Sequence, residues 1–162
     1  GSFACGMKAI ESKRWDLWIK EEWSILKKPF LGICLGMQMM ASYGSEGSQK
    51  SEWIKGLNII PGKVIPLDIS KNLRLPHIGW NSINWKEKSN LLSSGLNLIG
   101  DYYFVHSFFL KNDNPSNCLA VCNYGIDFSA VVAKDKNYGV QFHPEKSQGL
   151  GKKLLSNFLL ID

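Results

Sequence analysis

A cysteine framed by two glycines is the feature of this sequence that most restricts its fold. The motif Gly-x-Cys-x-Gly spans residues 32–36, after the apolar residues 29–31 and before the helix-like run 37–40, and it centres on Cys34. A glycine permits close backbone approach that a Cβ would block, so both glycines are expected to be needed for a sharp corner. The pattern predicts a strand-to-helix corner that raises Cys34 above a sheet edge, the thiol counterpart of a Gly-x-Ser-x-Gly nucleophile elbow. The positive end of the helix is expected to favour the thiolate.

A nucleophilic cysteine needs a base, and the sequence offers one near its other end. Residues 140–142 are expected to end a buried strand, which leads into His143, Pro144 and Glu145. An imidazole can take the thiol proton and later return a proton to a leaving amine. A carboxylate two residues further on can hold that imidazole in one tautomer. Because the two motifs lie far apart in the sequence, the predicted site is assembled by folding.

Composition indicates one soluble globular domain. The chain has 162 residues, of which 44% are hydrophobic and 20% are charged, which suits a domain with a real core. No apolar run reaches the roughly 20 residues of a membrane-spanning helix, so no membrane association is expected. The net charge is +5, but the lysines are scattered, which favours a solvated surface over a nucleic-acid interface.

The remaining cysteines and histidines are expected to be structural. Cysteines occur at positions 5, 34, 118 and 122 without a Cys-x-x-Cys pair, which predicts reduced thiols in a cytoplasm, with Cys118 and Cys122 in the core. His77 and His106 have no acidic neighbour two residues away, and we expect structural or interface roles for both. No ligand-like spacing is present, so neither a metal nor another cofactor is predicted.

Periodicity and turn residues predict an α/β sandwich whose second half contains antiparallel hairpins. Trp15, Trp18 and Trp23 are expected to pack within the first helix. The predicted elements are helices over 5–27, 36–43 and 147–161, a polar loop over 44–51, a turn and strand within 57–67, and strands over 29–33, 78–85, 102–109, 117–123, 128–133 and 138–142.

Several longer stretches carry a family resemblance together with the two motifs. They are residues 56–62, 75–81, 103–107, 141–147 and 154–158. On these residues the chain resembles the class I, triad-type glutamine amidotransferases over essentially its whole length. Within them it is most similar to the glutaminase subunits of imidazole glycerol phosphate synthase. The resemblance implies a flavodoxin-like three-layer sandwich with a mixed sheet.

The resemblance also implies the reaction and its residues. Cys34 would attack the side-chain amide of glutamine, His143 would move the protons, Glu145 would orient His143, and the backbone N–H of Leu35 would donate to the oxyanion. Glutamate and ammonia would be the products, formed without a cofactor.

Four further residues would hold L-glutamine. Gln38 lies one helical turn after the nucleophile and so on the same face. Glu46 would meet the α-ammonium group, although a carboxylate in a polar loop is by default solvated. Ser107 and Phe108 match the strand that pairs with the substrate backbone.

In the resembled family the ammonia passes to a (β/α)₈ synthase subunit, with which the glutaminase forms a heterodimer. That subunit forms imidazole glycerol phosphate and AICAR in histidine biosynthesis. Trp80, Tyr103 and Lys146 match positions at the subunit interface, where large aromatic side chains are favoured. Two alternatives remain open: a paralogous subunit for amidine formation on bacterial surface sugars, and a non-catalytic truncated fragment or scaffold that docks the synthase.

The resemblance begins late relative to the family. Members start with a βαβ unit of roughly 30 residues or more and a loop that supplies a second oxyanion donor. Residues 1–162 are therefore expected to form one glutaminase domain that is partial at its N-terminus. The strand over 29–33 would then lack a neighbour on one side.

Overall fold

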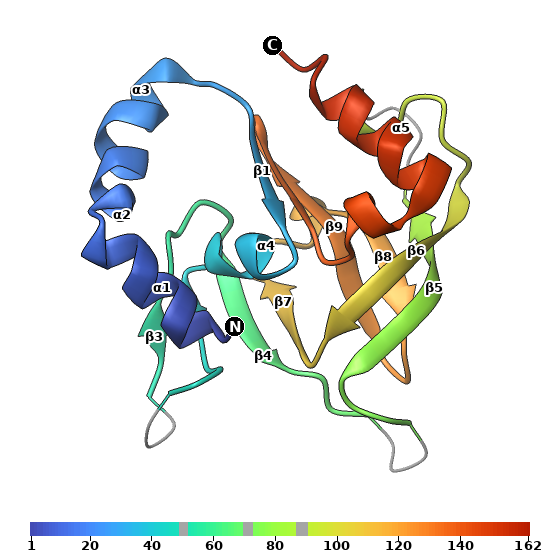
Figure 1. Ribbon diagram of the computed structural model, residues 1–162, viewed down its shortest axis with the longest axis horizontal. Helices are drawn as coiled ribbons and strands as arrows, with labels where there is room; N and C mark the ends of the chain where they lie inside the picture. Colours follow the sequence, from blue (N-terminus) through green and yellow to red (C-terminus); the bar gives the residue numbers. More distant parts are fainter. Residues whose placement is uncertain (49–51, 70–72, 87–90) are drawn as a thin grey trace.

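The computed structural model describes residues 1–48, 52–69, 73–86 and 91–162 (Figure 1). Residues 49–51 of the predicted polar loop lie outside the described residues. The helices are α1 (Phe3–Ser12), α2 (Trp15–Trp18), α3 (Ser24–Leu26), α4 (Leu35–Met39) and α5 (Gln148–Phe158), with a π-helical turn over Ile19–Trp23 and 3₁₀ turns over Leu91–Ser93, Pro115–Asn117 and Pro144–Lys146. The strands are β1 (Phe30–Ile33), β2 (Tyr43–Gly44), β3 (Ile54–Lys55), β4 (Gly62–Pro66), β5 (His77–Trp85), β6 (Ile99–His106), β7 (Phe108–Asn112), β8 (Cys118–Asn123), β9 (Asp127–Lys134) and β10 (Asn137–Val140).

The strands form a mixed sheet and a smaller second sheet. The larger sheet has the order β1-β10-β9-β8-β5-β6, and the smaller one has the order β3-β2-β4-β7. β1 runs parallel to β10, with Ile33 opposite Val140, whereas β10 and β9 are antiparallel. In the described part of the chain, β1 pairs with β10 alone. The parallel pair places the carboxyl ends of β1 and β10 side by side, and both candidate motifs leave the sheet there.

Helices cover both faces of the larger sheet, which confirms the three-layer α/β architecture. Neighbouring residues of a strand point to opposite faces. Val131 of β9 packs in the same buried cluster as Leu154 of α5, whereas Val132 packs with Phe3 of α1 and Met37 of α4. Figure 1 shows α1 and α4 on one side of β1 and β9 and α5 on the other.

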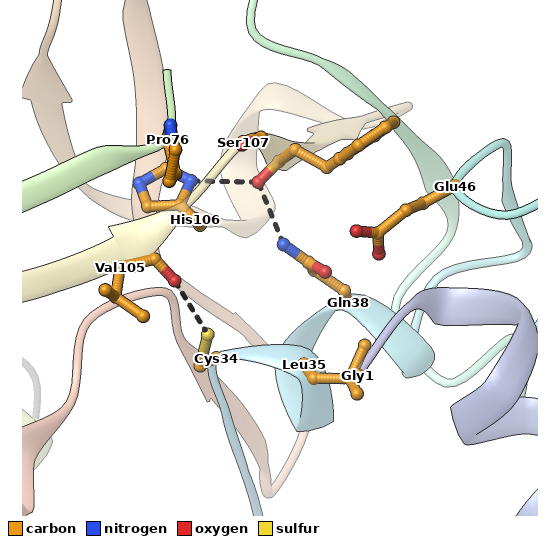
Figure 2. Close-up of a pocket in the computed structure, with 10 residues that line it drawn as sticks. Gly1, Cys34, Leu35, Gln38, Glu46, Pro76, Val105, His106 and Ser107 are labelled. Atoms are coloured by element: carbon orange, nitrogen blue, oxygen red, sulfur yellow. Dashed lines mark hydrogen bonds between the residues drawn. The ribbon is translucent and has the colours of Figure 1, made fainter. Parts of the chain in front are cut away.

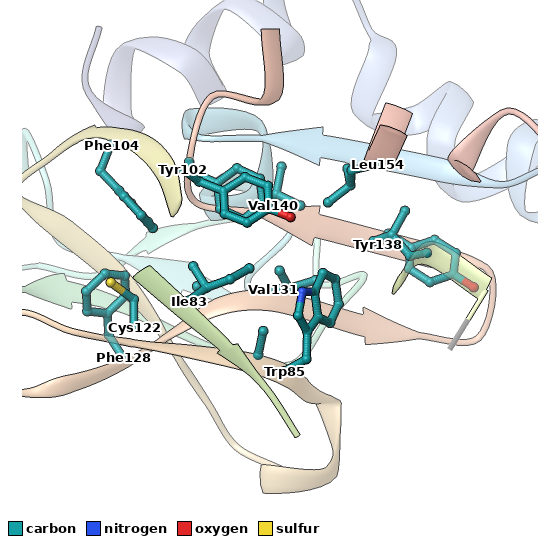
Figure 3. Close-up of a cluster of buried hydrophobic side chains, with 14 of the residues drawn as sticks. Ile83, Trp85, Tyr102, Phe104, Cys122, Phe128, Val131, Tyr138, Val140 and Leu154 are labelled. Atoms are coloured by element: carbon teal, nitrogen blue, oxygen red, sulfur yellow. The ribbon is translucent and has the colours of Figure 1, made fainter. Parts of the chain in front are cut away.

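The cluster under α5 is the larger core of the molecule. Figure 3 shows its side chains converging from β5, β6, β8, β9, β10 and α5. The rings of Tyr102 and Phe142 pack there at a tilt of 33°, with centroids 4.2 Å apart. Cys118 and Cys122 are both buried, which confirms that these two thiols belong to the core. The described part of the chain contains no helix with the length and apolar character needed to cross a membrane.

The first predicted helix, over 5–27, is interrupted. Arg14 has a φ of 56° and Lys27 a φ of 49°, in the left-handed region where a right-handed helix cannot continue. Because the chain reorients at Arg14, the apolar stripe does not stay on one face. Trp15 is 57% exposed and Trp18 is 44% exposed, so the prediction that they pack within the helix is wrong. Trp23 does pack, edge-on against Phe30 of β1.

Other predicted boundaries also differ from the structure, among them the C-terminal helix, predicted over 147–161 and observed as α5 over Gln148–Phe158. The predicted strand over 102–109 is two strands, because the chain bends at Ser107 and passes from the larger sheet (β6) to the smaller one (β7). The helix predicted over 36–43 ends at Met39, and β2 follows it. The strand predicted over 138–142 ends at Val140. Gln141 and Phe142 therefore belong to the segment that leads into the candidate site.

Candidate active site

Cys34 occupies the corner between β1 and α4. Its φ of 49° and ψ of −108° are unusual for a residue with a side chain, and such strain is typical of functional corners. The corner is held by two backbone hydrogen bonds: the Cys34 N–H donates to the Val140 carbonyl at 2.8 Å, and the Gln38 N–H donates to the Cys34 carbonyl at 3.1 Å. The predicted strand-to-helix elbow is therefore present.

The two glycines of the elbow are not equivalent. A Cβ on Gly32 would lie 2.6 Å from the Met40 sulfur and 2.7 Å from backbone atoms of Gly36 and Met37, whereas a Cβ on Gly36 would meet nothing within 4 Å. The expectation that both glycines avoid a clash is thus correct for Gly32 and wrong for Gly36. Gly36 lies on the open side of α4, facing a groove beside β1.

This difference predicts a matched pair of variants. Gly32→Ala should lower the free energy of unfolding by about 3 kcal/mol or more, because backbone atoms cannot yield to the added methyl group. Gly36→Ala should change it by about 1 kcal/mol or less, and toward higher stability, because alanine is the better helix former. Urea unfolding of both variants measures the difference. Equal destabilisation by the two substitutions would contradict the packing described for the corner.

The thiol itself is protonated in this environment. Burial raises the pKa of Cys34, and the negative charges of Glu145 and Glu46 raise it further. Hydrogen bonds from the Leu35 backbone and the Gln141 side chain lower the pKa, but by less. The Cys34 thiol donates to the Val105 carbonyl, with Sγ and O 3.8 Å apart. The Leu35 donor at the start of α4 does lower the pKa of Cys34, as predicted for the elbow, but burial and the two carboxylates outweigh it. A nucleophilic Cys34 needs a base to remove its proton.

His143 and Glu145 form a hydrogen-bonded pair beside this corner. His143 Nδ1 lies 2.7 Å from Glu145 Oε1. Since a carboxylate only accepts, Nδ1 carries the proton and Nε2 keeps a free lone pair. His143 Nε2 is buried and has no hydrogen-bond partner among the described residues. The imidazole thus has the tautomer that a general base requires.

Backbone contacts place this pair next to the elbow. The His143 N–H donates to the Tyr103 carbonyl of β6 at 2.8 Å. Two residues further along β6, the carbonyl of Val105 accepts from the Cys34 thiol. The Ser147 hydroxyl donates to the His143 carbonyl at 2.7 Å and accepts from the Tyr103 N–H. His143 also comes three residues after Val140, which accepts the Cys34 N–H. Strands β1, β10 and β6 therefore bring the two motifs to one edge of the sheet.

The predicted substrate residues meet at one pocket of about 210 Å³ (Figure 2). Gly1, Pro76, Val105 and His106 complete its wall. The predicted residues that line it are Cys34, Leu35, Gln38, Glu46, Ser107 and Phe108.

The pocket walls present acceptors for a cationic group. The side-chain amide of Gln38 donates to the Phe108 carbonyl at 2.8 Å and to Gln141 Oε1 at 3.1 Å, so both of its hydrogens are used and its oxygen remains for a ligand. Glu46 Oε2 accepts the N–H of Phe3 at 2.8 Å, at the start of α1. Figure 2 shows the Glu46 carboxylate directed toward Gln38. Glu46 is therefore fixed in the pocket wall by α1. It is not the freely solvated carboxylate that is the usual expectation for a polar loop.

The sequence analysis missed Gln141. This residue is fully buried, and its side-chain Nε2 lies 3.8 Å from Cys34 Sγ. Its signal in the sequence is a polar residue between the apolar Val140 and Phe142, because a buried amide requires partners. His106 was also assigned no part in the site, although it lines the pocket.

His77 and His106 are buried and hydrogen-bonded to each other, with His77 Nδ1 3.0 Å from His106 Nε2. This confirms a structural role for both. Burial lowers the pKa of each to about 4. Among the described residues, no group of three metal-ligating side chains comes together.

These pKa values predict an acid-sensitive fold. The unfolded chain binds protons at these histidines below about pH 6.5, while the folded chain does not until about pH 4. Stability is therefore complete above pH 6.5 and falls as the pH drops toward 4, by about 1.4 kcal/mol per pH unit for each histidine. Urea unfolding at about pH 7 and about pH 5 measures the slope. His77→Phe should flatten it, and an unchanged slope in that variant would contradict the assignment.

The three predicted interface residues gather on one surface. Trp80 is 48% exposed and meets Tyr103 edge-on, with ring centroids 6.0 Å apart. The Lys146 ammonium lies 5.7 Å from the centre of the Tyr103 ring, a cation–π arrangement. Lys146 directly follows Glu145, so this surface adjoins the candidate site.

Known proteins share both the sequence and the architecture. Residues 13–161 match the family described as glutamine amidotransferase class-I. The imidazole glycerol phosphate synthase subunit HisH 1 of Prochlorococcus marinus is 50% identical over 164 aligned positions, which cover 100% of this chain and 76% of that protein. The chain belongs to the class-I glutamine amidotransferases. A HisH 1 subunit of Campylobacter jejuni is 42% identical, covering 98% of this chain and 76% of that protein.

Solved structures agree with the fold of a class-I glutamine amidotransferase. A glutamine amidotransferase from Thermotoga maritima superposes with a TM-score of 0.58 at 19% identity, covering 91% of this chain and 53% of that one. A glutaminase domain of Trypanosoma brucei CTPS, solved with bound acivicin, gives a TM-score of 0.56 at 16% identity, covering 86% of this chain and 63% of that one. The flavodoxin-like α/β class predicted from the sequence is therefore confirmed. This chain is therefore an enzyme of a class that uses glutamine as its nitrogen source.

Proposed function

We propose that this chain is the glutaminase subunit of an imidazole glycerol phosphate synthase. It would hydrolyse L-glutamine to glutamate and ammonia and pass the ammonia to a (β/α)₈ partner subunit for histidine biosynthesis. The observation that carries the proposal is that a half-buried thiol at a strained corner and a tautomer-fixed imidazole lie at the same sheet edge, with His143 Nε2 left without a hydrogen-bond partner among the described residues. The identity of 50% to a HisH subunit supports the choice of partner.

In the proposed first step, Cys34 Sγ attacks the side-chain carbonyl carbon of glutamine. His143 Nε2 accepts the thiol proton, and Glu145, 2.7 Å from Nδ1, stabilises the imidazolium that forms. The raised pKa of Cys34 makes this transfer necessary, because the thiol does not ionise by itself near neutral pH. The Leu35 N–H, which already donates toward the sulfur, would donate to the oxyanion. Such a donor typically lowers the barrier by about 3 kcal/mol.

In the second step, the tetrahedral intermediate collapses. The C–N bond breaks, and His143 returns its proton to the departing nitrogen, which leaves as ammonia. The resulting thioester on Cys34 is attacked by water, from which His143 takes a proton. Glutamate is released, and the thiol is restored.

The pocket walls suit the amino-acid end of the substrate. Glu46 and the free oxygen of Gln38 are acceptors placed for an α-ammonium group, and both line the pocket with Cys34. Ser107 and Phe108, at the bend between β6 and β7, would contact the substrate backbone. The Phe108 carbonyl already accepts from Gln38 and His106. It would therefore shape the pocket rather than accept from the substrate.

The surface around Trp80, Tyr103 and Lys146 is the proposed contact with the synthase subunit in a heterodimer. It combines exposed aromatic area with one positive charge, a composition typical of interface hot spots. Lys146 is adjacent to Glu145 in the sequence. Docking at this surface could therefore act on the orientation of His143.

The test is ammonia release from glutamine with and without the cyclase subunit of imidazole glycerol phosphate synthase. Weak turnover by the chain alone and a rise of about tenfold or more with the partner are expected. Trp80→Ala should weaken this activation. Absence of glutamine turnover in the presence of the cyclase would overturn the proposal and favour a non-catalytic scaffold. Turnover that responds only to a different synthase would favour the surface-sugar alternative.

A further inference from the structure

A buried pair of histidines lies at the wall of the candidate pocket, which His106 lines. His77 of β5 is 2% exposed and His106 of β6 is 6% exposed, and these residues face each other across the antiparallel pair. The His77 ring stacks on Tyr124 at 4.0 Å and on Phe104 at 4.9 Å. Two aromatic faces therefore fix the His77 ring in place, which is more than a simple buried histidine needs.

The hydrogen bonds of this pair assign its tautomers. His106 Nδ1 lies 2.9 Å from the Phe108 carbonyl, which can only accept, so His106 Nδ1 carries a proton. In neutral His106, Nε2 is then an acceptor, and its partner His77 Nδ1, at 3.0 Å, must donate. His77 Nε2 is left as an acceptor for the Asn81 amide at 3.2 Å. Each hydrogen bond in this series therefore has one donor and one acceptor, and the donor-to-acceptor direction runs from Asn81 through His77 and His106 to the Phe108 carbonyl.

The chain of hydrogen bonds continues into the candidate site. The Phe108 carbonyl accepts from both His106 and the Gln38 amide, and Gln38 also donates to Gln141 Oε1 at 3.1 Å. The Gln141 amide in turn lies 3.8 Å from Cys34 Sγ. Figure 2 shows the dashed lines from His106 and from Gln38 that meet at one carbonyl oxygen, which the hydrogen bonds identify as that of Phe108. Uninterrupted side-chain and carbonyl contacts therefore link β5 to the nucleophile.

The bond from His106 to Phe108 also spans the bend at Ser107. It joins residues that are two apart, across the point where the chain leaves β6 for β7. Ser107 and Phe108 form the pocket wall at that bend. A rigid bend fixes where the Phe108 carbonyl points. That carbonyl then decides which way the Gln38 amide turns, because only the nitrogen end of an amide can donate to it.

We propose that His106, held in one tautomer by His77, is a positioning residue for glutamine binding, acting through the Phe108 carbonyl on Gln38 and Gln141. This inference rests on the proposed function, because it concerns the same pocket. In this arrangement the Gln38 oxygen faces the substrate and the Gln141 amide faces Cys34 Sγ. Burial lowers the pKa of both histidines to about 4, so the pair stays neutral at working pH, as the directed chain requires.

Two substitutions of His106 separate its two bonds. In His106→Asn, the short amide can place a donor near the position of Nδ1 and keep the bond to Phe108, while the contact with His77 is lost. In His106→Gln, the longer amide reaches the position of Nε2 and His77, while the donor to Phe108 is lost. Both variants remove the ring, so they share any packing loss.

The experiment measures KM and kcat for glutamine in complex with the cyclase subunit. His106→Gln should raise KM about tenfold with kcat within about threefold, because one positioning hydrogen bond of about 1.4 kcal/mol is lost. His106→Asn, which keeps a donor to the Phe108 carbonyl, should raise KM by clearly less than His106→Gln does. Equal effects of the two variants on KM, or no effect of either, would overturn the positioning role.

A second measurement keeps the test independent of turnover. Alkylation of Cys34 by iodoacetamide, followed against pH by peptide mapping, reports the thiol pKa. The midpoint should move to higher pH in His106→Gln, because the Gln141 donor is displaced, and should stay in place in His106→Asn. If the parent complex shows no turnover, the proposed function fails, but this comparison still decides the inference. Should His106→Gln not fold, His106→Phe, which keeps a ring against Phe128 but has no donor for the Phe108 carbonyl, carries the same two measurements with the same expected shifts.

Discussion

Replacement of Cys34 by alanine is expected to abolish glutamine-dependent synthesis and to leave ammonia-dependent synthesis by the complex intact. Cys34 is the thiol at the strained corner that lines the pocket, and no other cysteine of the chain lines it. Loss of a nucleophile that acts together with its base typically lowers kcat by about 10⁴-fold or more. Ammonia supplied from solution bypasses this step, because the chemistry that consumes it belongs to the partner.

The control for Cys34→Ala is Cys5→Ala, which removes an exposed thiol on α1. It should leave both activities within about twofold of the parent, as surface substitutions usually do. Product formation from glutamine and from ammonium salt is measured for each variant in the complex. Loss of both activities in Cys34→Ala would mean that Cys34 supports the structure instead of attacking glutamine.

Glu145→Gln is expected to lower kcat for glutamine by about 10³- to 10⁴-fold. Glu145 Oε1 lies 2.7 Å from His143 Nδ1 and holds the proton there. An amide can donate to Nδ1 instead, which moves the proton to Nε2 and removes the lone pair that would accept from Cys34. The Glu145 side chain is 51% exposed, so the substitution should change stability little.

A second property separates this loss from misfolding. The Glu145 charge raises the pKa of the Cys34 thiol, so its removal should shift alkylation of Cys34 to lower pH. Glu145→Gln should therefore make the thiol more easily ionised and the enzyme much slower. Glu52→Gln, at an exposed carboxylate, serves as the control and should change neither property. Normal turnover by Glu145→Gln would show that Glu145 does not orient His143.

The sequence predicted the chemical motifs well because each depends on local covalent constraints. The elbow at Cys34 needs a residue without a Cβ at Gly32, and the structure shows backbone atoms in the space that a Cβ would take. The pairing of His143 with Glu145 follows from their separation by two residues and the turn that Pro144 begins. These features are specified within a few residues.

The features that the sequence did not reveal depend on packing between distant segments. The raised pKa of Cys34 reflects burial and the charges of Glu145 and Glu46, and so could not be read from the short helix alone. The left-handed Arg14, which exposes Trp15 and Trp18, has no marker such as glycine. The series of hydrogen bonds from His77 to Gln141 forms only when the tertiary fold brings β5, β6 and the end of β10 around one site.

The proposed glutaminase reaction requires Cys34 and His143 to act together on glutamine. Labelling of the complex with a glutamine-mimicking chloroketone, followed by peptide mapping, tests it most directly. One adduct is expected, on Cys34; excess glutamine should prevent it, and it should form far more slowly in His143→Ala. An adduct on another residue, an unmodified Cys34, or labelling of Cys34 at the same rate without His143 would contradict it.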